Sequence, residues 1–129
     1  MNEIKEVIKK IIICEVIPYK VIIGKSREGK VKDVRNLIMK ILHENYNKTY
    51  AEIGYFFNRS HATIISNVSH ITDLIEVEPK INSKYNRYLR ILGLETLIDI
   101  DYMINHYNKG SIQLYELNEM LKEHYKYLD

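Results

Sequence analysis

The sequence predicts an all-α protein. Apolar residues recur at helical spacing along most of the 129 residues, and helix-capping residues stand between the apolar runs. The 46% hydrophobic content is ample for a core, and only two prolines and five glycines interrupt the chain. Nowhere do apolar and polar residues alternate convincingly enough to predict a half-buried strand, although residues 15–23 come nearest to such a pattern.

Three helices are expected in the first 45 residues. Residues 3–14 and 31–45 each carry apolar side chains along one helical face. Between them, Pro18 fits the first turn of a short helix that ends at Gly24. The positions expected to be buried are Ile4, Val7, Ile8, Ile11, Ile12, Val34, Leu37, Ile38, Ile41 and Leu42. The single cysteine, Cys14, lies among apolar neighbours, so we expect a buried, inert thiol in a chain without disulfides.

Residues 49–71 predict two short helices joined by a tight turn. Thr49 and Glu52 can form a capping box at the start of the first helix, and Asn58 tolerates the left-handed conformation that ends it. Ser60 is the expected N-cap of a second helix that extends to residue 75. The inner face of that helix carries Ile64, Val68, Ile71 and Ile75, and its outer face carries His61, Thr63, Ser66, Asn67 and His70. This is the layout of a helix-turn-helix, and the outer side chains are suited to reading base edges in the DNA major groove.

The last part of the chain predicts three further helices. One runs over 82–92, after the chain is broken at Pro79. The next, over 94–106, is apolar around most of its circumference, which implies burial against a neighbour. A turn follows, and Ser111 is the expected cap of the last helix.

The formal net charge of +2 is unevenly distributed. Residues 1–92 hold 16 lysines and arginines against 10 acidic residues, whereas residues 93–129 hold 3 against 7. Such asymmetry is typical of a chain whose basic part contacts nucleic acid. We therefore divide the chain into a DNA-binding domain of residues 1–92 and a C-terminal helical hairpin of residues 93–129. The hairpin is expected to pack on its own domain, to dimerise, or to bind a protein partner.

The residues of the turn carry a family resemblance. Ala51-Glu-Ile-Gly54, followed by Arg59-Ser-His-Ala-Thr63 and two isoleucines, is similar to the signature of the C-terminal DNA-binding domain of the DnaA family of bacterial replication initiators. The resemblance covers about residues 3–92. It implies a Trp-repressor-like helix-turn-helix fold, with helix 60–75 in the major groove and the basic loop near Arg27 in the minor groove.

The resemblance also implies individual DNA contacts. Arg27 aligns with an arginine that enters the minor groove, where the negative potential attracts guanidinium groups. Arg35 aligns with an arginine that contacts the DNA backbone. Further positions of the family's basic loop, first-helix start and motif are taken by Lys25, Tyr50, Ala51, Arg59, His61 and Thr63.

Two more candidate DNA contacts are predicted from the sequence without the resemblance. Lys48 directly precedes the first helix of the motif and is a phosphate partner by proximity, and Asn67 either contacts adenine bidentately or is solvated. Some positions depart from the family pattern. Ser60 replaces an acidic residue, Ala62 replaces a threonine and His43 replaces a lysine. We therefore expect DNA binding with a recognition sequence that differs from that of the family.

The sequence gives no support for catalysis. Residues 24–31 nearly match a phosphate-binding loop, but Val31 has no hydroxyl to hold Mg²⁺. The five histidines and Cys14 share no metal-ligand spacing. We expect no catalytic residue, no cofactor and no metal. With no apolar run long enough to span a membrane and no signal peptide, the prediction is a cytoplasmic protein.

The sequence therefore predicts a non-enzymatic, sequence-specific double-stranded DNA-binding protein. The resemblance implies a role in replication initiation, its regulation or transcription, in a host or in a phage or other mobile element. The alternative, from a different class, is a protein-interaction adaptor that uses the helix-turn-helix as a scaffold and the acidic C-terminal hairpin as its binding surface. Salt-dependent binding to duplex DNA distinguishes the two.

Overall fold

The computed structural model describes residues 2–94 and 100–126, and every regular element within these ranges is a helix, as the sequence predicts. The chain divides into two compact units, Met1–Leu74 and Ile75–Asp129. The proposed division into residues 1–92 and 93–129 stays a prediction. None of the helices in the described ranges is long and apolar enough to cross a membrane.

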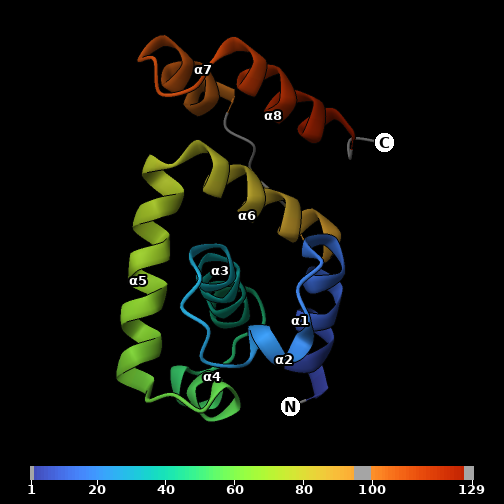
Figure 1. Ribbon diagram of the computed structural model, residues 1–129, viewed down its shortest axis with the longest axis vertical. Coiled ribbons are helices and arrows are strands. Elements are labelled where there is room, and N and C mark those ends of the chain that lie inside the picture. The colour runs from blue at the N-terminus through green and yellow to red at the C-terminus, as the bar shows by residue number, and fades with distance from the viewer. Residues whose placement is uncertain (1, 95–99, 127–129) are drawn as a thin grey trace. The chain divides into compact units, whose positions relative to one another are not determined.

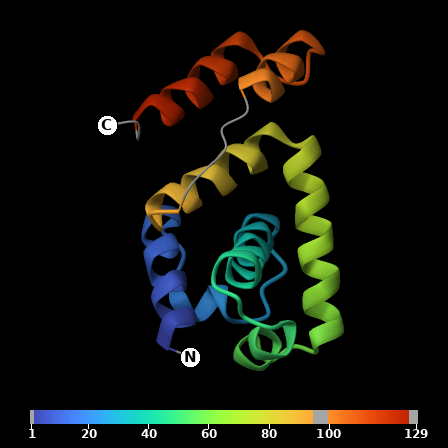
Figure 2. The ribbon, with the colours of Figure 1, turned by 180° about the vertical axis from the view of Figure 1, so that it is seen from behind.

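The first unit is built around one central helix. Its elements are α1 (Asn2–Glu15), α2 (Tyr19–Ile22), α3 (Gly29–Asn45), α4 (Tyr50–Phe57) and most of α5 (His61–Val77). In both ribbon views α3 lies between α1 and α5 (Figures 1 and 2). Every residue of α3 from Val34 to Leu42 is buried, although the sequence pattern predicted only one buried face. A helix surrounded by neighbours must bury its polar positions too, and α3 buries Arg35, Asn36 and Lys40.

The local signals of the helix-turn-helix are confirmed. The hydroxyl of Thr49 accepts a hydrogen bond from the Glu52 N–H at 3.0 Å, and the Glu52 carboxylate accepts one from the Thr49 N–H at 3.1 Å, so the capping box is complete. Asn58 is left-handed, with φ 54° and ψ 50°. Ser60 Oγ accepts a hydrogen bond from the Thr63 N–H at 3.2 Å, which caps the start of α5.

The prediction that Cys14 is buried is wrong, because its thiol is exposed. The buried stripe of α1 runs through Ile4, Val7, Ile8, Ile11, Ile12 and Glu15. Cys14 and its neighbour Ile13, which is 77% exposed, lie off that stripe. Apolar neighbours in the sequence did not indicate burial here, because the rotation of the helix decides which side chains face the core.

The second unit comprises the end of α5, then α6 (Pro79–Ile91), α7 (Ile100–Asn108) and α8 (Leu114–Lys126), and α8 contacts both α6 and α7. α5 runs two residues beyond the expected end, and α6 begins at Pro79 itself. The fixed φ of proline suits the first position of a helix, so Pro79 starts α6 instead of merely ending α5. α8 begins at Leu114, so Ser111 is not its cap. Residues 95–99 of the expected 94–106 helix lie outside the described ranges.

Candidate nucleic-acid interface

The turn between α4 and α5 depends on a glycine. The N–H of Arg59 donates to the Gly54 carbonyl at 2.8 Å and the N–H of Asn58 donates to the Tyr55 carbonyl at 3.3 Å, which is the Schellman pattern of helix ends. The chain then passes so close to α4 that a Cβ on Gly54 would lie 2.5 Å from the Arg59 carbonyl oxygen. The glycine therefore sets how closely α5 can follow α4.

Two reciprocal hydrogen bonds join the turn to the basic loop between α2 and α3. Lys25 Nζ donates to the Asn58 carbonyl at 2.7 Å, and Arg59 Nη2 donates to the Gly24 carbonyl at 2.7 Å. Arg59 Nη1 also donates to the Phe57 carbonyl at 3.0 Å. Each segment thus supplies a cation to the backbone of the other, and we call this arrangement the loop–turn clamp.

Arg35 holds the same loop from inside the protein. Only 3% of this residue is exposed, and its Nε, Nη1 and Nη2 atoms donate to the carbonyls of Ile22, Ser26 and Val21 at 2.7, 2.9 and 3.1 Å. Val21 and Ile22 end α2 and Ser26 lies in the basic loop, so one side chain of α3 joins both segments. Burial lowers the pKa of Arg35, and the nearby charge of Arg59 lowers it further. Arg35 is thus placed to shape the basic loop.

A cleft of about 370 Å³ opens between the basic loop, α3 and the start of α5. Its lining includes five cationic residues, Lys25, Arg27, Lys32, Arg35 and Arg59, and no acidic residue. The remaining lining residues are Ser26, Asn36, Thr63 and Asn67. The structure therefore brings together six residues of the predicted DNA-binding set, namely Lys25, Arg27, Arg35, Arg59, Thr63 and Asn67. Sequence reasoning missed Ser26, Asn36 and Lys32, although Lys32 belongs to a visibly basic stretch.

The recognition helix presents its predicted residues in different ways. His61 and Thr63 are exposed, and the Thr63 hydroxyl lies 2.9 Å from Ser60 Oγ. Asn67 is half-buried, with Nδ2 at 3.9 Å from the sulfur of Met39. Thr63 and Asn67 line the cleft, whereas His61 does not.

The candidates at the start of α4 form a second group. The Tyr50 ring stacks on His43 with 3.9 Å between ring centroids, and His43 Nδ1 lies 2.8 Å from the Lys48 carbonyl oxygen, to which it donates. Lys48 Nζ forms an ion pair with Glu3 at 2.9 Å, and this hydrogen bond raises the pKa of Lys48. Ala51 is exposed beside this group. The distance between Glu3 and Lys48 in the sequence explains why no pattern indicated their pairing.

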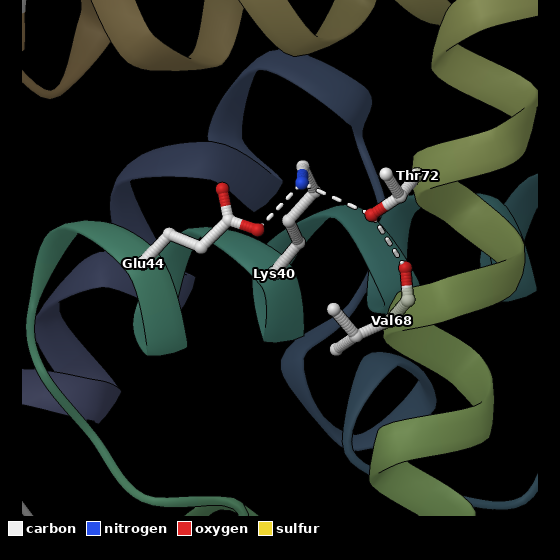
Figure 3. Close-up of polar contacts among 4 residues, drawn as sticks. All are labelled: Lys40, Glu44, Val68 and Thr72. Carbon is white, nitrogen blue, oxygen red and sulfur yellow. Dashed lines mark hydrogen bonds and ion pairs between the residues drawn. The ribbon is translucent and has the colours of Figure 1, made fainter.

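A polar network fixes α5 against α3 (Figure 3). Lys40, which is only 8% exposed, donates from Nζ to Glu44 Oε2 at 2.6 Å and to Thr72 Oγ1 at 3.0 Å. Thr72 Oγ1 in turn donates to the Val68 carbonyl at 2.7 Å. A buried lysine requires such partners, so the network favours one position of α5 along α3.

The comparisons with known proteins agree with this geometry. The sequence profile described as "Bacterial dnaA protein helix-turn-helix" matches residues 4–71, more than half of the chain. The chromosomal replication initiator protein DnaA of Mycoplasma pneumoniae (strain ATCC 29342 / M129 / Subtype 1) is 28% identical over 60 residues, which are 46% of this chain and only 14% of that relative. No solved structure matches the chain. Since the profile match runs from α1 into α5, the chain belongs to the bacterial DnaA helix-turn-helix family.

Proposed function

We propose that this protein is a non-enzymatic, sequence-specific double-stranded DNA-binding protein. In this proposal α5 enters the major groove and the basic loop near Arg27 enters the adjacent minor groove. One observation carries the proposal: the basic loop and the first turns of α5 line a single cleft that contains five cationic residues and no acidic one. The negatively charged phosphate backbone of DNA separates the major from the minor groove. A cationic cleft between two elements that enter adjacent grooves would therefore face that backbone.

The loop–turn clamp supports binding in two grooves at once. If the basic loop moved independently of α5, binding would have to order it at an entropic cost. The hydrogen bonds of Lys25 and Arg59 to the opposing backbone hold the two segments together before DNA arrives. We therefore assign Lys25, Arg35 and Arg59 mainly to positioning the basic loop.

Direct contacts with DNA are assigned to side chains that do not hold the basic loop in place. Arg27 and Lys32 are exposed and form no side-chain hydrogen bond or ion pair within the described residues, so both are available to DNA. Thr63, Asn67 and His61 are the candidates for base edges on α5. At the start of α4, the backbone N–H groups of Tyr50 and Ala51 and the side chain of Lys48 are the candidates for phosphate.

The biological role is proposed from the family. The relative in Mycoplasma pneumoniae is a chromosomal replication initiator, and we propose that this chain acts in replication initiation, its regulation or transcription, in the cytoplasm. The proposal also covers such a role in a phage or other mobile element. Where the family has an acidic residue, a threonine and a lysine, this chain has Ser60, Ala62 and His43. We therefore propose that it recognises a DNA sequence different from that of the family.

A test is selection of bound sequences from a random duplex pool, followed by affinity measurements over a salt series. We expect one enriched motif and a steep fall in affinity with salt. Replacing Arg27 by Ala should weaken binding to most sequences and reduce the slope of log K against log salt by about 0.9. Lys20→Ala removes an exposed cation outside the cleft and is the matched control. The absence of salt-dependent duplex binding would reject the proposal.

The adaptor function is the second candidate. It is supported by exposed apolar side chains on α7 and α8, where Ile104, Leu114 and Tyr115 are 42%, 55% and 72% exposed. Such residues are typical of surfaces that bind a second copy or another protein. We propose residues 93–129 as that surface. A protein that binds a partner through this region and shows no affinity for duplex DNA would favour the adaptor.

A further inference from the structure

The cationic cleft contains one feature that DNA binding alone does not require. Asn36 lines the cleft, is only 1% exposed, and neither its Nδ2 nor its Oδ1 has a hydrogen-bond partner. A buried amide without a hydrogen-bond partner destabilises the folded state, because it has lost its hydrogen bonds to water. Buried polar groups without partners are rare in folded proteins and call for an explanation, such as a missing ion or ligand.

The charges around Asn36 indicate the sign of such a ligand. Arg27 and Lys32 have no partner among the described residues, and Arg35 and Arg59 use only some of their N–H donors on backbone carbonyls. With no carboxylate in the lining, the positive charges are not balanced locally. An anion with several charges and several acceptor oxygens would balance these charges and accept from the remaining donors.

A second cleft among the described residues provides a contrast. It lies within the second unit, has a volume of about 490 Å³, and is lined by Lys80, Lys84 and Arg87 together with Glu116 and Glu119. Lys80 Nζ lies 3.7 Å from Glu116 Oε2. Cations there face carboxylates, so that cleft does not select an anion.

We propose that the cationic cleft also binds a free oligophosphate anion, such as pyrophosphate or the phosphate chain of a nucleotide. Arg27 and Lys32 bind its outer oxygens, the remaining donors of Arg35 and Arg59 bind its inner oxygens, and a rotation of the Asn36 side chain turns its buried amide toward the anion at the floor of the cleft. The cleft, at about 370 Å³, has room for a compact anion of this kind. The anion occupies Arg27 and Lys32, which the proposed function assigns to DNA, so its regulatory effect, competition with DNA, rests on that function.

The test begins with the full chain in the absence of DNA. Pyrophosphate is titrated at constant ionic strength, and the backbone and side-chain amide signals are followed by NMR. We expect saturation at one anion per chain, with the Asn36 side-chain NH₂ signals among the most strongly shifted. A linear, non-saturating response, or Asn36 signals that stay in place at saturation, would overturn the proposal.

Lys32→Gln and Lys30→Gln form a matched pair of variants. Both lysines are exposed in the first turn of α3 and both changes remove one positive charge, but only Lys32 lines the cleft. Loss of one charge-assisted hydrogen bond should weaken pyrophosphate binding about tenfold or more in Lys32→Gln. Lys30→Gln should change it less than about twofold, because the charge it removes is exposed and screened. Equal losses in the two variants would show general attraction to a basic surface and overturn the proposal.

Competition is then measured with labelled duplex at the same ionic strength, using sulfate as the control anion. We expect pyrophosphate to displace the duplex at concentrations at which sulfate does not. If the chain binds pyrophosphate but no duplex, the proposed function fails and the anion site stands. If it binds duplex but pyrophosphate acts no more strongly than sulfate, only the anion site fails.

Discussion

At the scale of single residues, the cations of the candidate interface lie in three different environments. Arg35 and Arg59 donate to backbone carbonyls, Lys48 pairs with a carboxylate, and Arg27 and Lys32 are exposed. A count of positive charges in the sequence does not separate these environments. Truncating Arg35 should therefore act through the shape of the loop, whereas truncating Arg27 should act through charge.

Glu3→Gln should strengthen duplex binding. The change releases Lys48 from its ion pair with Glu3 and removes a negative charge close to the proposed phosphate contact. One more available cation should steepen the slope of log K against log salt by up to about 0.9. Fluorescence anisotropy over a salt series measures both quantities.

Glu6→Gln is the control for this variant. Glu6 lies on the same helix, is exposed, and its replacement changes the net charge by the same amount. Equal gains in affinity for Glu3→Gln and Glu6→Gln would mean that Lys48 has no specific role.

At the scale of elements, the geometry of the helix-turn-helix rests on short-range contacts near the turn. A complete capping box starts α4, a left-handed Asn58 ends it, and Ser60 caps α5. These contacts lie within a few residues of one another, which is why the sequence was sufficient to predict them.

Gly54→Ala should destabilise the fold by about 1–3 kcal/mol, the cost of overpacking a site where backbone must move. The new methyl would lie 2.5 Å from the Arg59 carbonyl oxygen. Duplex affinity should fall with stability, because the turn sets the position of α5. Chemical denaturation and anisotropy measure the two effects.

Gly29→Ala is the matched control for the glycine variant. Gly29 begins α3, and no atom lies within 4 Å of a Cβ built there. This change should leave stability unaltered or raise it by about 0.4–1 kcal/mol through the unfolded state. If both variants lost stability equally, close packing at Gly54 would not be the cause.

The capping box should make stability depend on pH. Backbone and side-chain hydrogen bonds from Thr49 lower the pKa of Glu52. Since the folded pKa lies below the unfolded value of about 4.3, the stabilisation is fully present above about pH 4.3 and is lost as the pH falls through the folded pKa. The difference in Tm between wild type and Glu52→Gln should therefore shrink on acidification. A difference independent of pH would contradict this role.

At the scale of the whole molecule, charge is divided along the chain. Residues 93–129 carry seven acidic against three basic residues, so a chain that ends at Leu92 has a net charge of +6 in place of +2. The shortened chain should associate with duplex DNA faster and more tightly at low salt. The gain should diminish as salt rises, because screening weakens long-range attraction.

Circular dichroism is the control for the shortened chain. Retention of helix content and cooperative melting would support the division into residues 1–92 and 93–129. If the shortened chain folds but binds duplex no more tightly than the full chain at low salt, the acidic region does not oppose DNA binding.

The sequence by itself determined the helices of the helix-turn-helix, their caps and the turn, because each depends on residues only a few positions apart. It also identified six of the nine residues that line the cationic cleft, through the family resemblance and the motif. The tertiary structure alone decided the exposure of Cys14, the burial of every residue of α3 from Val34 to Leu42, the pairing of Lys48 with Glu3 and the unpartnered amide of Asn36. These features arise where helices distant in the sequence pack together, and the local pattern of a helix specifies neither its neighbours nor its rotation against them.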